Sequence, residues 1–357
     1  MKKHFSKATP ISVILNLILI INVIIVVYPV LFTISSSLTK SNSLAATSVI
    51  PFTEQTDKST VEMCEACEGK GYRYIDIKSS YKENGKTKTY IGKKLVDCNV
   101  CHGEGEVAVL HTSFKIKKPS LYQFRRLLTG SEQIVKGETT VHGTNYKNWY
   151  LNTLKIAIMN TILTVFICTT TGYIFSRFNF TGRKQIMAGM IVLQMFPSFI
   201  GMVATYVILW KFNALNTLWG LVLVYASGSI PFNAQLMKGY FDTMPRDIAE
   251  AAYIDGASPL VAYLRVILPA AKPQIVFLTL TSFTGPWMDY IFPRMVLRSD
   301  DKKTLAVGLY EMISGRSNDN FTMFAAGAIL VAVPFTIFFM AGQRTLLMSL
   351  AGTSGKE

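Results

Sequence analysis

Residues Pro245 to Pro273 read PRDIAEAAYIDGASPLVAYLRVILPAAKP, a stretch that predicts two short helices separated by a glycine turn. Asp247 and Glu250 bring negative charge to the start of the first helix, where the helix dipole favours it. Gly256 is placed to end that helix, because glycine readily adopts the left-handed conformation that follows many helix C-termini. The pattern therefore predicts a compact helix-turn-helix loop.

The second helix of this loop has its own start signal. Ser258 supplies an N-cap oxygen, and Pro259 suits the first helical turn. The helix is predicted to run to Pro269. Four of its residues are spaced to share one apolar face: Leu260, Tyr263, Leu264 and Ile267. Taken alone, the segment is either an amphipathic connector or a docking element for a partner protein.

Long apolar stretches surround this loop. Half of the 357 residues are hydrophobic and only 16% are charged, and a helix needs about 20 mainly apolar residues to cross a bilayer. The predicted spans are Ile11 to Ile34, Tyr150 to Phe175, Ile186 to Leu209, Leu218 to Leu236, Gln274 to Leu297 and Met323 to Gly342. The predicted fold class is therefore an all-α polytopic membrane protein with six transmembrane helices.

Basic residues set the predicted orientation of these spans. The lysines within Met1 to Lys7 precede a first span that is too long for a signal peptide, so we predict a retained anchor. Alternation of the spans then places both termini and the loop on the cytoplasmic side of the plasma membrane, in contact with its lipids. The net charge of +14 fits basic loops and a lysine-rich external segment, so no nucleic-acid partner is expected.

The loop resembles the EAA loop of ATP-binding cassette (ABC) importer permeases, in which Glu-Ala-Ala and a glycine are followed by Leu-Pro. In that family the loop docks as a coupling helix into a cleft on a separate ATPase subunit. The resemblance implies that small side chains at Ala249, Ala251 and Ala252 permit close approach of the partner. It assigns ATPase coupling to Glu250, Ala251, Ala252, Asp255, Gly256, Leu268 and Pro269.

Other stretches resemble carbohydrate importer permeases of the MalG type. They are NWYLNTLKIA from Asn148, MFPSF from Met195, IPFNAQLMKGYFDTMP from Ile230 and FTGPWMDYIFP from Phe283. The resemblance covers the first span and about Lys118 to the end. It implies a complex with a second permease subunit, an ABC ATPase dimer and an extracellular sugar-binding protein, which imports maltose or maltodextrin-like sugars.

The domain organisation follows from the spans. Residues 1–34 form the cytoplasmic N-terminus and first span, and residues 35–149 form an external segment with an insert at about 54–117. Residues 150–342 form the permease core, with the EAA-like loop at 240–273. Residues 343–357 form a cytoplasmic tail.

The insert carries two copies of CxxCxGxG. Together they supply four thiolates suited to tetrahedral zinc: Cys64, Cys67, Cys98 and Cys101. The repeat resembles half of the cysteine-rich zinc module of DnaJ-type chaperones. Between the two copies, aromatic and β-branched residues on either side of Glu83-Asn84-Gly85 predict a β-hairpin. Disulfide bonds are the alternative, because an external site can be oxidising and four cysteines allow three pairings.

Polar residues inside the spans are candidates for the substrate path, because polar groups in hydrocarbon are costly unless they face protein or water. The candidates are Gln194, Asn233, Trp287, Asp289 and Tyr290. A carboxylate beside aromatic rings suits a sugar. The alternative is that Asp289 pairs with a neighbouring helix or with the partner permease. Prolines that would bend or break the spans are Pro197, Pro231, Pro286, Pro293 and Pro334.

These features bear on three possible functions. The sequence holds no GxxxxGK[ST] phosphate loop, so we predict a non-catalytic transport subunit that binds no nucleotide itself. The alternative is a membrane-anchored chaperone or redox protein that acts through the CxxCxGxG module. An ion-coupled secondary transporter would call for ionisable relays and repeat symmetry, which the sequence does not clearly show. The EAA-like loop favours the importer permease.

Overall fold

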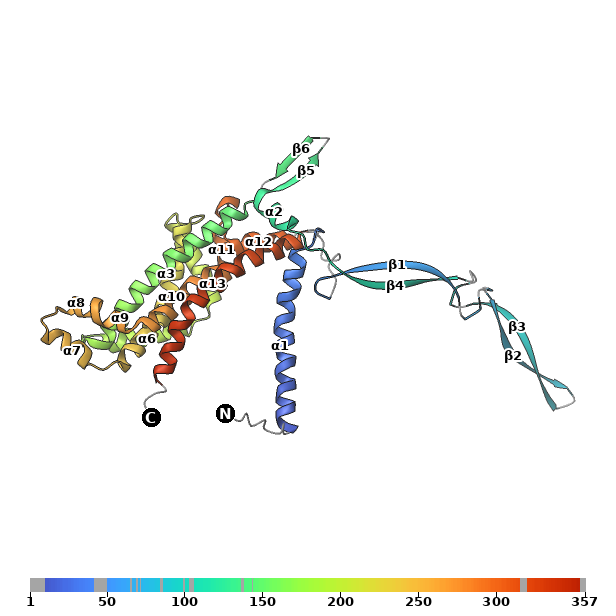
Figure 1. The fold of residues 1–357 in the computed structure, drawn as a ribbon, viewed down its shortest axis with the longest axis horizontal. Coiled ribbons are helices and arrows are strands. Elements are labelled where there is room, and N and C mark those ends of the chain that lie inside the picture. Colours follow the sequence, from blue (N-terminus) through green and yellow to red (C-terminus); the bar gives the residue numbers. More distant parts are fainter. Residues whose placement is uncertain are drawn as a thin grey trace, which may run out of the picture. The chain divides into compact units, whose positions relative to one another are not determined.

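The computed structural model describes residues 10–41, 50–64, 66–68, 70, 72–83, 86–98, 100–102, 106–135, 138–142, 144–314 and 320–353. The chain divides into two compact units (Figure 1). The helical unit comprises Met1–Leu44 and Ser120–Glu357, and the inserted unit comprises Ala45–Pro119. The predicted insert at about 54–117 lies within the second unit.

The helical unit is built from helices of very different length. The long ones are α1 (Pro10–Ser37), α3 (Tyr146–Arg177), α4 (Arg183–Gln194), α5 (Ser198–Lys211), α6 (Leu218–Thr243), α10 (Lys272–Met288) and α13 (Phe321–Thr353). The short ones are α2 (Tyr122–Thr129), α7 (Asp247–Ile254), α8 (Pro259–Ala262), a π-helical turn (Tyr263–Ile267), α9 (Leu268–Ala270), α11 (Ile291–Val296), a 3-10 turn (Asp300–Lys302) and α12 (Leu305–Ile313). A small hairpin pairs β5 (Ser131–Val135) with β6 (Glu138–His142).

Several of these helices are long and apolar enough to cross a membrane. Within the described residues, three continuous helices meet this description: Ile14–Ser37, Tyr146–Arg177 and Phe321–Gln343. Two bent pairs raise the number to five: Arg183–Gln194 with Phe199–Lys211, and Pro259–Ala270 with Lys272–Met288. The prediction of a polytopic, mainly helical membrane protein is confirmed, whereas the count of six spans stays a prediction.

Two predicted spans are interrupted. The third is bent by 106° between α4 and α5, where Pro197 lies between the two helices. The fifth is broken at Asp289 and Tyr290, between α10 and α11. At this second break an Asp289 carboxylate oxygen accepts a long hydrogen bond from the Phe292 backbone N–H, at 3.4 Å. Such local bonds compete with continuation of a helix, and the interruption agrees with the expectation that prolines such as Pro286 and Pro293 would bend or break the predicted spans.

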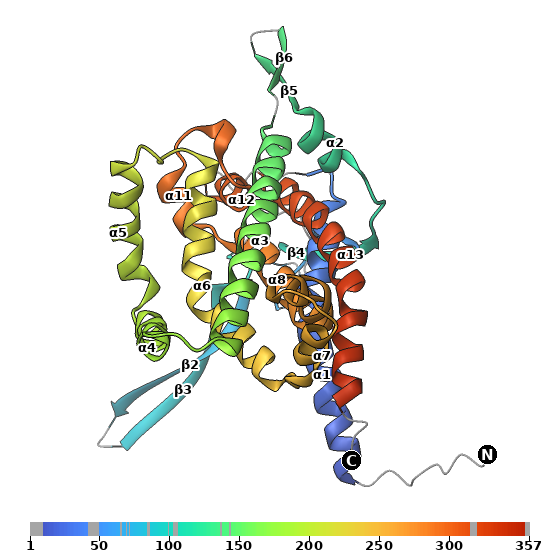
Figure 2. The ribbon, with the colours of Figure 1, turned by 90° about the vertical axis from the view of Figure 1, so that its left-hand side faces the viewer.

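The helix α3 is central to the packing of this unit, where it lies beside α6 (Figure 2) and also contacts α10. Polar groups join these helices as well as apolar ones. The Asn160 side-chain amide donates to the Ser282 carbonyl at 2.8 Å, and the Thr164 and Ser229 hydroxyls lie 3.3 Å apart. Bonds of this kind between helices are one of the forces that hold membrane bundles together.

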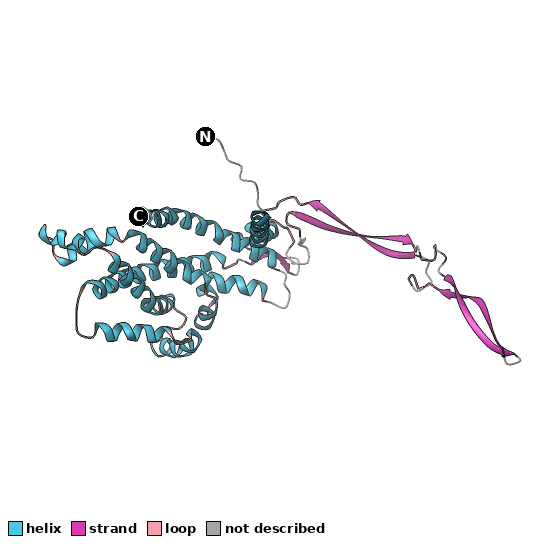
Figure 3. Ribbon diagram, turned by 90° about the horizontal axis from the view of Figure 1, so that it is seen from below, coloured by secondary structure: helices cyan, strands magenta, loops and turns pink. Residues whose placement is uncertain are grey.

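The inserted unit consists of two separate antiparallel pairs of strands (Figure 3). β2 (Tyr72–Glu83) pairs with β3 (Lys86–Asp97), with Glu83 opposite Lys86. These arms confirm the predicted hairpin, whose turn residues Asn84 and Gly85 lie outside the described residues. β1 (Thr53–Met63) pairs with β4 (Glu106–Ile116). This second pair was not predicted, because its partners are far apart in the chain and β1 is largely polar.

Close approach of α3 and α6 generates a stability prediction. A Cβ atom on Gly172 of α3 would lie 2.6 Å from the Met237 Cβ of α6. We therefore expect Gly172→Ala to lower the free energy of unfolding of the detergent-solubilised protein by about 1–3 kcal/mol, measured by equilibrium unfolding. Gly239→Ala is the matched control, because a Cβ there meets nothing within 4 Å. Equal stability of the two variants would contradict this account of the packing.

Candidate functional site

The predicted helix-turn-helix loop is present as a helix, a left-handed glycine and a second helix. α7 carries Asp247 and Glu250 in its first turn. Gly256 has a φ of 82°, which is the left-handed conformation expected after α7. The Ser258 side chain accepts a hydrogen bond from the Val261 backbone N–H at 3.4 Å, and Pro259 opens α8. The predicted pair of short helices around a glycine turn is therefore confirmed.

The inward face of the loop is formed by small and aromatic side chains. Ala249 and Tyr263 are buried in one cluster with Tyr173 of α3 and Phe241 of α6. Ala252 is 8% exposed. Ala249 and Ala252 therefore allow α7 to approach the rest of this unit closely, and only Ala251 of the three predicted alanines remains exposed for a partner. The helical period explains this, because residues three apart share a face.

The outward face of the loop is unexpectedly apolar. Ile254 is 86% exposed, Leu260 is 64% exposed and Leu264 is 51% exposed. The spacing predicted that Leu260 and Leu264 share one apolar face with Tyr263 and Ile267. In the structure Tyr263 and Ile267 are buried, whereas Leu260 and Leu264 are exposed, so this prediction was wrong. The chain leaves the α-helical period at Tyr263, where the π-helical turn begins. A face predicted from regular α-helical spacing therefore does not continue through this turn.

The seven residues assigned to coupling lie on both faces of this loop. Glu250, Ala251, Asp255, Gly256 and Pro269 are exposed, as is Ile254. Leu268 is half-buried, and it packs against the cluster that contains Tyr263. The loop thus presents an acidic and apolar surface around the Gly256 turn.

Two cavities bring together most of the residues predicted for the substrate path. A cavity of about 730 Å³ is lined by Gln194, Tyr225 and Asp289 together with apolar residues of α5 and α6. A smaller cavity of about 380 Å³ is lined by Tyr225 and Asn233 with polar groups of α3 and α10. Tyr225 of α6 borders both cavities.

Tyr225 was missed by the sequence reasoning. Its hydroxyl donates a hydrogen bond of 2.9 Å to an Asp289 carboxylate oxygen. Asp289 thus pairs with a neighbouring helix, as the alternative reading of this residue expected. A tyrosine within an apolar span is the signal that was available, since a buried phenol needs a hydrogen-bond partner.

The structure places Trp287 and Tyr290 apart from these cavities. Trp287 is 8% exposed, and its ring lies 5.2 Å from that of Tyr150 and 5.1 Å from that of Phe335, between centroids. The Tyr290 ring lies 4.3 Å from that of Tyr310. Both residues therefore belong to aromatic packing on either side of Asp289.

The four cysteines of the inserted unit converge on one point. All four Sγ atoms lie within 4.8 Å of one another, with Cys64 and Cys98 at 3.8 Å and Cys67 and Cys101 at 3.6 Å. Four thiolates at about 2.3 Å from a central zinc would lie about 3.8 Å apart, whereas a disulfide requires about 2.05 Å. The cluster has the dimensions of a tetrahedral metal site.

The two cysteine loops also repeat one backbone geometry. Glu68 follows Cys67 with a φ of 53°, and His102 follows Cys101 with a φ of 52°. Backbone N–H groups of Cys101 and Val100 lower the pKa of the Cys98 thiol to about 6. In the same cluster burial raises the pKa of the Cys64 thiol to about 11, so these contacts favour the thiolate, which is the form that binds metals, at Cys98 and not at Cys64.

The helical unit and its exposed loop define a polytopic membrane protein of the transport class. The chain belongs to the family described as "Binding-protein-dependent transport system inner membrane component", whose model matches residues 168–346. It is 42% identical over 214 residues to the maltodextrin transport system permease protein MdxG of Bacillus subtilis (strain 168), covering 59% of this chain and 77% of that protein.

Two further similar proteins agree with the assignment of the chain to this family. The galactooligosaccharides transport system permease protein GanQ of Bacillus subtilis (strain 168) is 34% identical over 250 residues, which cover 70% of this chain and 85% of GanQ. Among solved structures, a bacterial ABC transporter involved in the import of the acidic polysaccharide alginate matches with a TM-score of 0.64 and 18% identity, over 96% of this chain and 99% of the other. At that identity the likeness concerns the fold alone.

The predicted ABC importer permease is therefore confirmed. The matched residues 168–346 lie in the helical unit and include the loop, so these helices are themselves transport machinery. The alternative of a chaperone or redox protein, for which the spans are only an anchor, is not supported.

The Tyr225 and Asp289 pair generates a prediction. We expect Tyr225→Phe and Asp289→Ala each to destabilise the protein, with a coupling of about 1–3 kcal/mol in a double-mutant cycle, because each change removes one partner of the same charge-assisted bond. Equilibrium unfolding in detergent measures this coupling. Tyr225→Phe combined with Gln194→Ala is the control, since the Gln194 amide donates to the Met190 carbonyl of its own helix. Additive effects in the Tyr225 and Asp289 cycle would contradict the pairing.

Proposed function

We propose that this chain is a transmembrane subunit of an ABC importer for maltose or maltodextrin-like oligosaccharides. The observation that carries this proposal is the 42% identity over 214 residues to a maltodextrin permease, together with the family match over residues 168–346, which include the coupling loop. The likeness to a galactooligosaccharide permease at 34% supports oligosaccharides as the substrate class.

The proposed complex contains a second permease subunit, a dimer of ABC ATPase subunits and an extracellular sugar-binding protein. ATP is hydrolysed by the ATPase subunits, because this sequence has no phosphate loop of its own. The exposed side of the EAA-like loop, with Ile254 at its tip and Glu250 and Asp255 beside it, is the proposed ATPase contact. We assign both termini and this loop to the cytoplasmic side of the plasma membrane on the basis of the basic N-terminus.

The cavities at Tyr225 are the proposed contribution of this chain to the sugar path. The Asp289 carboxylate is a strong hydrogen-bond acceptor at the wall of the larger cavity, and Gln194 and Asn233 supply amides to the two cavities. Sugar hydroxyls need such acceptors and donors when they leave water. Alternating access would then open these cavities to one side of the membrane at a time.

A reconstituted complex tests the importer function. We expect proteoliposomes that contain this chain and its complex partners to accumulate a labelled maltodextrin only with ATP and the binding protein present. Ile254→Asp should reduce recovery of the ATPase subunit with this chain at least about fivefold, because it places a charge in an apolar contact. Ile254→Leu is the control and should retain the ATPase. ATP-independent uptake, or normal ATPase recovery with Ile254→Asp, would contradict the proposal.

We also propose zinc as the metal held by Cys64, Cys67, Cys98 and Cys101. Four cysteine ligands at tetrahedral spacing are typical of structural zinc sites. Isolated two-stranded sheets are only marginally stable in water, and the four cysteines form the apolar cluster found among the described side chains of this unit. When bound, zinc would therefore supply folding free energy to the insert.

Elemental analysis of the purified protein tests the zinc proposal. We expect about one zinc per chain, lost in the variants Cys64→Ser and Cys98→Ser, because three thiolates bind zinc much more weakly than four. Cys168→Ser is the matched control, since Cys168 is buried in α3 of the helical unit. A protein without zinc, in which the four thiols react with a thiol reagent only after reduction, would instead establish disulfides.

A further inference from the structure

The coupling loop needs a rigid connection to the spans if movement of a partner is to change the transport path. Tyr263 makes such a connection, to α3. It begins the π-helical turn directly after α8 and is 7% exposed. Turns of this type often occur at functional sites, because the extra residue shifts the direction of a side chain.

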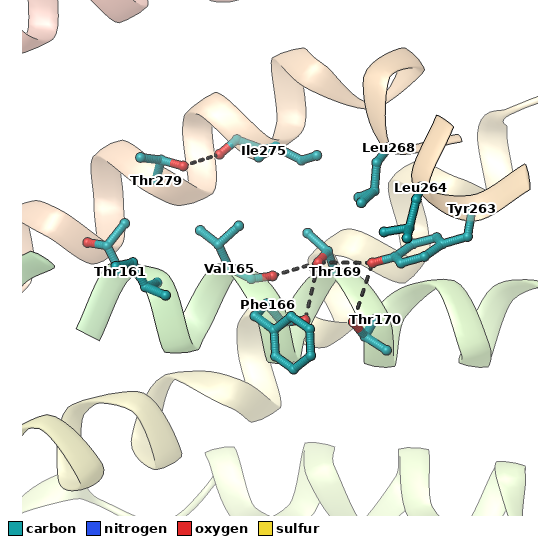
Figure 4. A pocket seen from close by; sticks show the side chains of 11 residues that line it. Thr161, Val165, Phe166, Thr169, Thr170, Tyr263, Leu264, Leu268, Ile275 and Thr279 are labelled. Carbon is teal, nitrogen blue, oxygen red and sulfur yellow. Dashed lines mark hydrogen bonds between the residues drawn. The ribbon is translucent and has the colours of Figure 1, made fainter. Parts of the chain in front are cut away.

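The Tyr263 hydroxyl joins a chain of hydrogen bonds on α3 (Figure 4). It donates to the Thr169 hydroxyl at 3.2 Å, and Thr169 in turn donates to the Val165 carbonyl at 2.6 Å. The Thr170 hydroxyl lies 3.4 Å from the Tyr263 oxygen. Since the Tyr263 proton is directed at Thr169, Thr170 is the donor in this last contact. Chains of this kind strengthen one another in a medium of low dielectric constant.

The Tyr263 ring makes a second connection to the same helix. It stacks on the ring of Tyr173 with 4.6 Å between centroids and 29° between planes. Tyr173 meets the ring of Phe241 of α6 edge-on, at 5.8 Å and 78°. Three aromatic rings therefore join the coupling loop to the ends of α3 and α6.

Tyr263 and its partners Thr169 and Thr170 all border an open volume. A cavity of about 500 Å³ lies between α3 and α10, and its lining includes Tyr263, Thr161 and Thr279 (Figure 4). Tyr263 is thus held firmly to α3, whereas α3 and α10 are separated here by space that no side chain of the described chain fills. Farther along, α3 and α10 remain joined by the bond from Asn160 to Ser282, so it is only beside this cavity that a shift of the loop can change their spacing without first breaking packed contacts.

We infer that Tyr263 is a positioning residue that transmits displacement of the coupling loop to α3, through its hydroxyl on Thr169 and Thr170 and its ring on Tyr173. The inference rests on the proposed function of this chain as an importer permease. Tyr263 lies outside the Glu-Ala-Ala and Leu-Pro positions that the sequence assigns to coupling, and it acts on α3 rather than on the ATPase.

The experiment uses the complete reconstituted complex and measures sugar transported per ATP hydrolysed. Tyr263→Leu keeps an apolar side chain but removes both the ring and the hydroxyl. We expect this ratio to fall at least about fivefold, the lower end of typical coupling effects, while the ATPase subunit still co-purifies. Tyr263→Phe keeps the ring and removes the donor, so we expect an intermediate loss. Thr169→Val should match Tyr263→Phe, and the two changes together should cost no more than either alone.

Thr279→Val is the matched control, because Thr279 lines the same cavity but donates its hydroxyl to the Ile275 carbonyl of its own helix at 2.8 Å. It should retain the wild-type ratio. A wild-type ratio for Tyr263→Leu, or an equal loss for Thr279→Val, would overturn the inference. Absence of ATP-dependent transport by the wild-type complex would instead overturn the proposed function, so the two failures are distinguishable.

Discussion

Close packing of α3 against α6 and α10 is the interaction on which the helical unit depends. Lipid tails are as apolar as leucine, so helices in a membrane associate by close contact and by hydrogen bonds between them rather than by escape from water. Gly172 permits that contact beside Met237, and the Asn160 amide adds a bond to α10. Both ends of α3 are occupied as well. The Trp149 indole N–H donates to the Asp300 carbonyl at 2.8 Å, and Tyr173 receives the ring of Tyr263. The segment after α11 and the coupling loop are therefore attached to one rigid element.

The inner and outer faces of the coupling loop have opposite requirements, and one short sequence meets both. Its inner face must approach the bundle closely, and the small side chains of Ala249 and Ala252 meet that need. Its outer face must be available to another protein, and there Ile254 and Leu260 remain in contact with solvent at an energetic cost that burial by a partner would remove. A surface of this kind is typical of a subunit that does not work alone, which agrees with the family to which the chain belongs.

The inserted unit is not built from packed helices. Its two pairs of strands are separate sheets, and two strands bury too little apolar surface to be stable alone. Among the described side chains of this unit, the four cysteines form the buried apolar cluster, and a metal bound to them would supply folding free energy from few residues.

Local chemistry in the sequence by itself determined the apolar spans, the two helices around Gly256, the β2 and β3 hairpin and the convergence of two CxxC loops. The spans, the loop helices and the hairpin depend on periodicity, capping or turn residues within a few positions of one another, whereas the two CxxC loops lie 34 residues apart and were matched by their repeated motif. Only the tertiary structure decided that Leu260 faces outward, that β1 pairs with β4, that Asp289 receives the Tyr225 hydroxyl and that Tyr263 contacts α3. These features join residues that are distant in the chain or lie where the helix leaves its regular period. Their geometry is set by packing between elements, which no local pattern of side chains encodes.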